Sequence, residues 1–140
     1  METDNETQGA DPIEQGGCAC GAARFRVKGA PRRVSICHCM TCRRVHGSAF
    51  GAYAMFARTD VELFGTTRVW QSSSQGRRHF CEVCGSVAFM EYLGLDEIDL
   101  PLGAFDRTGL YEPTYELWCC RREPWLSGDG RTEYRQDRPH

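Results

Sequence analysis

The sequence predicts a mainly β domain, and three observations lead to that prediction. Short runs rich in β-branched and aromatic residues follow one another along the chain, separated by Gly and Pro. Only one short segment has the pattern of a helix. The chain has 140 residues, of which 41% are hydrophobic and 26% are charged, and these values suit one globular domain with its own core.

The strands are predicted in chain order from alternating apolar residues. The run 23–27 alternates, so Phe25 and Val27 share one face, and the run 32–37 alternates likewise and ends on Cys37. Regular spacing of such short runs favours an all-β domain over alternating strands and helices. The full set of predicted strands is 23–27, 32–37, 50–57, 61–64, 68–70, 78–81, 87–93, 97–103 and 114–119.

One or two short helical turns are expected beside these strands. The stretch MTCRRVHG, residues 40–47, is the best helix candidate, and Gly47 stops it. The stretch GLYEPT, residues 109–114, is typical of a loop.

The two ends of the chain are expected to lie outside the folded part. Residues 1–15 are polar and acidic, which predicts a disordered N-terminal tail. A single folded domain is predicted for residues 16–135, and a C-terminal tail for residues 136–140. The polar chain after Trp125 is expected to fray.

Charge and hydropathy exclude several classes of protein. The formal net charge is −2, so no global field attracts nucleic acid or an anionic membrane. We find neither an apolar run of membrane-spanning length nor a signal peptide, and we expect a cytoplasmic protein without a membrane partner. Nine cysteines in a reducing compartment favour metal binding or thiol chemistry over disulfides.

Two cysteine pairs are each followed by glycine, in CACG and CEVCG. Zinc prefers four soft or borderline ligands in a tetrahedron, and a glycine after the second cysteine lets the chain turn back toward the sulfur atoms. Two such turns facing each other complete a shell of four sulfurs. The predicted ligands of one structural zinc are therefore Cys18, Cys20, Cys81 and Cys84.

Three further cysteines, Cys37, Cys39 and Cys42, cannot complete a tetrahedron by themselves. Three protein ligands and one open position are typical of a catalytic zinc. A second structural zinc completed by His38 or His46 is the alternative. Alternation along a strand points His38 away from Cys37 and Cys39, so His38 would be a fourth ligand only if the chain twists there. We expect two Zn²⁺ sites per chain, with the three-cysteine site partly empty because three ligands hold zinc less firmly than four.

The last two cysteines, Cys119 and Cys120, follow Trp118 in a predicted apolar strand. Adjacent residues of a strand point to opposite faces, so the two thiols are not expected to join one site. Core packing is the simplest role for them.

Residues near the three cysteines are candidates for binding a substrate. Arg43 could hold a substrate carboxylate or balance the anionic cluster, whereas Arg44 is expected to be a solvated surface residue. Ser48 could donate a hydrogen bond to a developing alkoxide, or it could equally cap the turn before the strand that starts at Phe50. His46 is the nearby group that titrates near neutrality. The serines 72–74 could line a peptide-like substrate, although an ordinary loop is the simpler interpretation. The aromatic residues Phe56 and Trp70 are candidates for a pocket wall or for the core.

Four stretches together resemble the glutathione-dependent formaldehyde-activating enzyme family, which includes centromere protein V-like proteins. The resemblance runs from Gly16 to about Tyr134. It rests on GGCACGAARFRV, CHCMTCRRVHGSAF, WQSSSQGRRHFCEVCGS and YELWCCRREPWL. It implies a β-tent fold of antiparallel sheets around a structural zinc, the same division of zinc ligands, and carbon–sulfur chemistry on a glutathione-type adduct. Cys119 and Cys120 depart from the small or β-branched apolar residues usual in the family.

The sequence therefore predicts a zinc-dependent carbon–sulfur lyase, similar to S-(hydroxymethyl)glutathione synthase, that acts on glutathione or a related thiol–aldehyde adduct. One alternative is a non-catalytic zinc module for a protein or nucleic acid, with a basic stripe formed by the arginine pairs 32–33, 43–44, 77–78 and 121–122. The sequence pI of about 6.1 argues against a nucleic-acid partner. A thiol redox enzyme using Cys119 or Cys120 is the other alternative.

Overall fold

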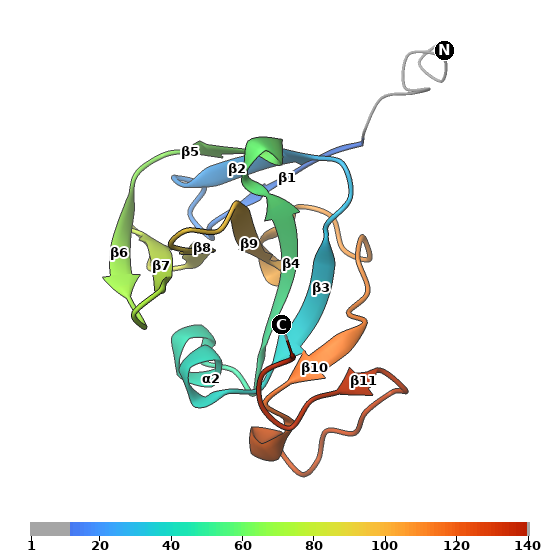
Figure 1. Ribbon diagram of the computed structural model, residues 1–140. Coiled ribbons are helices and arrows are strands. Elements are labelled where there is room, and N and C mark those ends of the chain that lie inside the picture. The colour runs from blue at the N-terminus through green and yellow to red at the C-terminus, as the bar shows by residue number, and fades with distance from the viewer. Residues whose placement is uncertain (1–11, 140) are drawn as a thin grey trace.

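The computed structural model describes residues 12–139 and shows the predicted mainly β fold. Most predicted strands form within one or two residues of their expected ends (Figure 1). The elements are β1 Ile13–Gly17, β2 Arg24–Lys28, β3 Arg33–Cys37, α2 Met40–His46, β4 Gly51–Ala57, β5 Val61–Phe64, β6 Thr67–Gln71, β7 Gly76–Cys81, β8 Val87–Tyr92, β9 Glu97–Pro101, β10 Tyr115–Leu117 and β11 Thr132–Glu133, with 3-10 turns at Arg58–Asp60, Leu102–Ala104 and Cys119–Arg121.

The strands form two sheets. The larger has eight strands in the order β11-β10-β3-β4-β9-β8-β7-β6, and the smaller has the order β1-β2-β5. In Figure 1 the smaller sheet crosses one end of the larger sheet, and α2 lies near the opposite end. Neighbouring strands are antiparallel, as expected, except that β10 runs parallel to both β3 and β11.

The apolar core lies between the two sheets. Phe25 and Val27 of β2 are both buried, as their alternation predicts, and they belong to one cluster with Phe56, Ile98 and Leu100 of the larger sheet. Phe56 is fully buried in this cluster, so its role is core packing. Burial of such side chains contributes about 1.5–3 kcal/mol each, which makes this cluster the main source of stability.

The other face of the larger sheet carries polar side chains. Paired residues of neighbouring strands point to the same face, and one such row crosses five strands of the sheet. The row consists of Arg33, Met55, Asp99, Met90 and Arg78. Cys37 lies four residues after Arg33 on β3 and therefore shares this face. The three-cysteine group is thus built on the polar face and not in the apolar core.

Helix α2 begins and ends at the expected residues. Cys39 is its N-cap, and the Cys39 sulfur accepts a hydrogen bond from the Cys42 amide at 3.3 Å. Gly47 ends the helix with φ 59°, a left-handed conformation that glycine adopts without strain. The Cys39 sulfur therefore caps the helix and also lies within 4.8 Å of the Cys42 sulfur in the first turn.

The chain ends differ from the expectation. β1 begins at Ile13, inside the segment expected to be a tail, and pairs with β2 through backbone hydrogen bonds. Residues 1–11 lie outside the described part. The C-terminal segment is also paired, because β11 joins β10 and the Trp118 amide donates to the Gln136 carbonyl at 3.0 Å. The stretch after Trp125 is therefore tied to the sheet at its far end and does not fray as a whole.

The predicted end of the strand 114–119 was wrong. β10 stops at Leu117, and Trp118 has φ 55°, which a side chain with a Cβ rarely adopts. The Trp118 indole donates to the Asp137 carboxylate at 2.9 Å, which helps to fix this turn. Cys119 and Cys120 consequently lie in a 3-10 turn and not in an apolar strand.

Within residues 12–139, no helix combines the length and apolar character that crossing a membrane requires.

Candidate functional site

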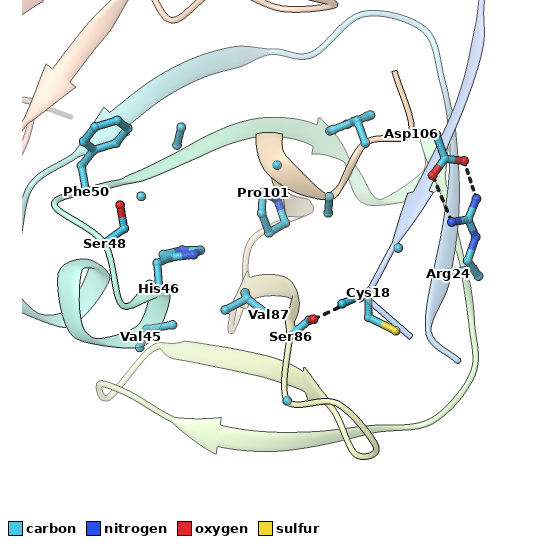
Figure 2. Close-up of a pocket in the computed structure, with 18 residues that line it drawn as sticks. Cys18, Arg24, Val45, His46, Ser48, Phe50, Ser86, Val87, Pro101 and Asp106 are labelled. Atoms are coloured by element: carbon cyan, nitrogen blue, oxygen red, sulfur yellow. Dashed lines mark hydrogen bonds and ion pairs between the residues drawn. The ribbon is translucent and has the colours of Figure 1, made fainter. Parts of the chain in front are cut away.

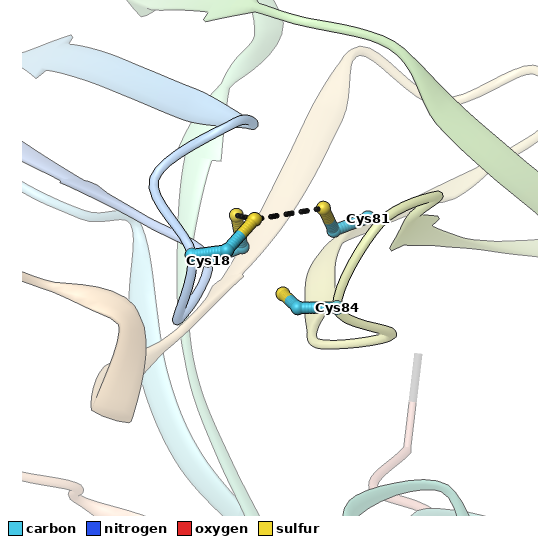
Figure 3. A group of neighbouring side chains, drawn as sticks. Cys18, Cys81 and Cys84 are labelled. Carbon is cyan, nitrogen blue, oxygen red and sulfur yellow. Dashed lines mark hydrogen bonds between the residues drawn. The ribbon is translucent and has the colours of Figure 1, made fainter.

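Two hairpin turns bring together the four cysteines of the predicted structural site. Cys18 and Cys20 lie in the turn between β1 and β2. Cys81 ends β7 and Cys84 lies in the turn that follows, so that both face Cys18 (Figure 3). The four sulfur atoms lie within 4.8 Å of one another. Gly21 has φ 84° and Gly85 has φ 79°, so both glycines make the left-handed turns for which the sequence required them.

The spacing of these sulfurs fits a metal ion better than a disulfide. The Cys20 sulfur lies 3.7 Å from both the Cys18 and the Cys81 sulfur, whereas a disulfide bond is about 2.05 Å long. A tetrahedral zinc with Zn–S bonds of about 2.3 Å places its sulfurs about 3.8 Å apart. All four cysteines are free thiols. The group is therefore compatible with zinc.

Amide and hydroxyl groups surround the same sulfurs. The Ala23 amide donates to the Cys18 sulfur at 3.2 Å, and the Val83 amide donates to the Cys81 sulfur at 3.4 Å. The Ser86 hydroxyl lies 3.2 Å from the Cys84 sulfur, and hydrogen bonds from Ser86 lower the pKa of Cys84 to about 5. Such donors stabilise thiolates, the form in which cysteine binds a metal.

The second group forms where β3 leads into α2. Cys37 ends the strand, Cys39 caps the helix and Cys42 lies in its first turn, with the three sulfurs within 4.8 Å of one another. Cys37 and Cys42 are buried, whereas Cys39 is half-buried. Hydrogen bonds from the Cys37 and Cys42 thiols lower the pKa of Cys39 to about 2. The pKa values of Cys37 and Cys42 are raised within the same group. Three sulfurs this close form a donor set that suits a soft or borderline cation.

Neither histidine completes this group. His38 points away from the sulfurs, as the strand alternation predicts, and its Nε2 lies 2.8 Å from the Glu116 carboxylate. His46 instead lies with its Nε2 2.7 Å from the Tyr53 hydroxyl, which donates to the Cys42 sulfur at 3.2 Å. Burial lowers the pKa of His46, with a smaller effect in the same direction from the charge of Arg78. His46 therefore lies one side chain removed from the three-cysteine group.

Of the residues expected to bind substrate, Ser48 lines a cavity and Arg43 does not. Ser48 is exposed and lines a large cavity, whereas Arg43 donates to the Glu123 carboxylate at 2.6 Å and to the Ala49 carbonyl at 3.3 Å. Arg44 is exposed, as expected. The charge of Arg43 is thus already compensated by Glu123.

A residue that the sequence analysis missed is Arg78 of β7. Its guanidinium Nη2 lies 3.8 Å from the Cys42 sulfur, and its Nε donates to the Ser72 hydroxyl at 3.1 Å. Only its position three residues before Cys81, within the stretch RRHFC, could have indicated a role. Ser72 therefore orients a buried arginine, while Ser73 accepts a hydrogen bond from the Gly76 amide within its own turn.

A cavity of about 760 Å³ lies between the two cysteine groups, with Cys18 of the four-cysteine group and His46 among the residues that line it. In Figure 2, His46 and Ser48 lie on one side of it, and Ser86 and the ion pair of Arg24 with Asp106 lie on the other. The cavity does not contact the three cysteines directly. His46 and the Tyr53 hydroxyl lie between the cavity and the Cys42 sulfur. Trp70 is about half exposed on β6 and is absent from the residues that line this cavity.

Half of the eight arginines expected to form a basic stripe, Arg43 among them, are engaged with carboxylates. Arg32 and Arg33 both contact Glu97, and Arg122 contacts Glu116 and Glu133. The charges of these arginines are therefore compensated locally, which weakens the expected stripe.

Cys119 does not resemble a reactive thiol. Its sulfur lies within 4.8 Å of the ligand atoms of His38 and Glu116, and burial raises the pKa of Cys119. Glu116 is already bonded to Arg122 and Arg131, so a cation at this place would compete with two arginines.

Comparison with known proteins identifies the family. The family described as glutathione-dependent formaldehyde-activating enzyme matches residues 13–121, most of the chain. The chain belongs to this family. An uncharacterized lyase of Schizosaccharomyces pombe is 31% identical over 81 residues, which cover 58% of this chain and 59% of the relative. A Halomonas elongata protein, named among glutathione-dependent formaldehyde-activating enzymes, is 33% identical over 87 residues, which cover 54% of each chain.

The chain thus spans between half and three fifths of the two curated relatives that it matches. A crystal structure of a Rhodobacter sphaeroides protein superposes with a TM-score of 0.55 at 21% identity, over 69% of this chain and 90% of that one. This likeness shows that the two proteins share a fold.

Proposed function

We propose that the protein is a zinc-dependent carbon–sulfur lyase that acts on the adduct of a small thiol, such as glutathione, with an aldehyde. The observation that carries the proposal is the three-sulfur group, which His46 and Tyr53 separate from a cavity large enough for a tripeptide. Family membership and the names of the two relatives support the same class of reaction.

The two cysteine groups receive different roles in this proposal. We assign a structural zinc to Cys18, Cys20, Cys81 and Cys84, because four sulfurs close its coordination shell. A second zinc is assigned to the three-cysteine group, where one coordination position stays open because His38 and His46 are bonded elsewhere. Zinc bound there would supply a Lewis acid that favours the ionised form of a substrate thiol.

The residues of the cavity would bind and orient the adduct. Cleavage breaks the C–S bond of an S-hydroxymethyl adduct, the bonding electrons go to sulfur, and the hydroxyl loses its proton as the carbonyl forms. In the reverse direction the thiolate adds to the aldehyde carbon, and the oxygen takes up a proton. The exposed Ser48 hydroxyl lines the cavity and can donate to that oxygen, as the sequence suggested.

Two other side chains shape the cavity without contacting the reacting bond. His46 and Tyr53 separate it from the Cys42 sulfur: Tyr53 donates a hydrogen bond to that sulfur, and His46 is bonded to the Tyr53 hydroxyl. We assign Arg43 to the contact between α2 and Glu123, since that carboxylate already occupies its guanidinium.

The proposal is tested by exchange of formaldehyde with glutathione. Carbon-13 exchange NMR would measure the interconversion of formaldehyde hydrate and the glutathione adduct in the presence of zinc-loaded protein. We expect acceleration by the wild type, none by Cys39→Ser, and a loss of at least about tenfold in Ser48→Ala. The matched control, Ser74→Ala, changes an exposed loop serine and should retain full activity. Equal exchange rates with and without fully zinc-loaded wild type would refute the assignment.

A further inference from the structure

Arg78 is a buried cation beside the three-cysteine group. Only 4% of its surface is exposed, although β7 is next to the edge strand of the sheet. Its Nη2 lies 3.8 Å from the Cys42 sulfur and its Nε is held by the Ser72 hydroxyl, while its Nη1 has no hydrogen-bond partner. A buried guanidinium is costly unless an opposite charge compensates it.

The carboxylate nearest in the sheet is a poor counter-ion for this arginine. Asp99 lies in the same cross-strand row, separated from Arg78 by Met90 of β8. Burial raises the pKa of Asp99 to about 7, even though Arg33 and Arg78 act in the opposite direction. Asp99 is therefore separated from Arg78 by Met90 and only partly ionised near neutral pH, so it compensates the charge of Arg78 only in part.

The three-cysteine group supplies the missing negative charge. Three thiolates around a divalent cation leave a net charge of −1, and one arginine beside Cys42 cancels it. Among residues 12–139, Arg78 is the one cationic side chain that donates to any of the three sulfurs, because Arg43 is directed to Glu123. The charge of the group and that of the arginine are therefore each unfavourable alone and favourable together.

We infer that Arg78 is a positioning residue of the three-cysteine centre, which neutralises the metal-bound thiolates and holds the Cys42 sulfur in place. This inference rests on the proposed function to the extent that the three cysteines bind a metal ion. It adds a residue that was absent from the expected site. Because β7 carries Arg78 and also ends on Cys81, one strand supports both cysteine groups.

The test measures metal affinity and not catalysis. Zinc-loaded protein would be competed against a chromophoric chelator, which removes the more weakly held zinc first, and cobalt would then replace that zinc so that thiolate-to-metal absorption reports the site. Arg78→Met and Arg78→Gln remove the charge, Arg78→Lys retains it, and Arg77→Met is the matched control on the same strand. The Arg77 side chain alternates to the opposite face of the sheet.

We expect the second, weaker equivalent of metal to bind about 10- to 100-fold less tightly in both neutral variants. The first equivalent should be unchanged, Arg78→Lys should recover part of the loss, and Arg77→Met should match the wild type. If the wild type binds two equivalents and a folded neutral variant binds the second one equally tightly, the role of Arg78 is overturned while the two-metal proposal stands. A wild type that binds only one equivalent would overturn this inference and the two-metal proposal together. If both neutral variants unfold while Arg78→Lys stays folded, the positive charge is needed for the fold, and the specific link to the metal centre is overturned.

Discussion

Replacing Glu116 tests most severely how the three-cysteine group is held in place, because Glu116 is bonded to His38 next to Cys37 and Cys39. Its carboxylate is almost fully buried and is bonded to His38 at 2.8 Å, to Arg122 at 3.3 Å and to Arg131 at 3.0 Å. In the chain, His38 lies between Cys37 and Cys39, two of the proposed metal ligands. Replacing Glu116 with Gln keeps the volume but leaves two arginines and a histidine facing a neutral amide.

The magnitude follows from the burial of this network. Removing one partner of a buried charge pair typically costs about 3–5 kcal/mol, and an amide retains some of the hydrogen bonds, so we expect the lower end. A loss of about 3 kcal/mol corresponds to a fall of about 10 °C in Tm for a domain of this size. The matched control is Glu133→Gln, since the half-exposed Glu133 contacts the same Arg122, and it should cost less than about 1 kcal/mol.

The pH dependence gives a second criterion. Burial alone would raise the pKa of Glu116, but hydrogen bonds from His38 and Arg131 outweigh burial and lower it. A lowered pKa means that the carboxylate contributes its full stability above its unfolded pKa and loses it as pH falls through the folded pKa. Chemical denaturation of zinc-loaded wild type and Glu116→Gln should therefore show a stability gap that does not shrink between about pH 8 and pH 6. A gap below 1 kcal/mol, or one that shrinks in this range, would refute the reasoning.

Three further predictions concern the remaining parts of the site. Cys84→Ser should abolish cooperative unfolding by circular dichroism, because a structural zinc supplies folding energy; an unchanged transition would show that the four-cysteine group is not structural. Gly51→Ala should cost about 1–3 kcal/mol in denaturation and weaken binding of the second zinc in a chelator titration, because its Cβ would lie 2.6 Å from the Tyr53 hydroxyl. Gly103→Ala, which meets open space, is its control, and equal effects would contradict the packing argument. Asp99→Asn should stabilise the protein by roughly 3 kcal/mol at about pH 9. The raised pKa of Asp99 gives stability that is complete below its unfolded value and is lost as pH rises through about 7, so a mutant less stable at every pH would contradict this sign.

The local features of the fold could be predicted from the sequence because they depend on neighbouring residues. The strand 61–64 has the predicted bounds, and α2 stops at Gly47 because the left-handed turn favours glycine. The pairing of the two cysteine turns also followed from local spacing, since each turn offers two sulfurs and zinc needs four.

Features that depend on long-range contacts could not be predicted. Arg78 meets Cys42 across 36 residues and His38 meets Glu116 across 78, and neither contact has a periodic pattern. β1 and β11 were missed because they are polar and form through backbone hydrogen bonds to neighbouring strands. The end of β10 was placed wrongly because the turn at Trp118 is fixed by residues near the C-terminus, which apolar alternation does not report.

The count of zinc ions per chain tests the central claim most directly. Elemental analysis would be made on zinc-reconstituted wild type and Cys39→Ser, with circular dichroism as the measure of folding. Two separate centres predict two zinc ions in the wild type and one in the folded mutant, because Cys39 belongs only to the three-cysteine group. One zinc in both folded proteins would contradict a metal at the three-cysteine group. Unfolding of Cys39→Ser would contradict its separation from the structural site.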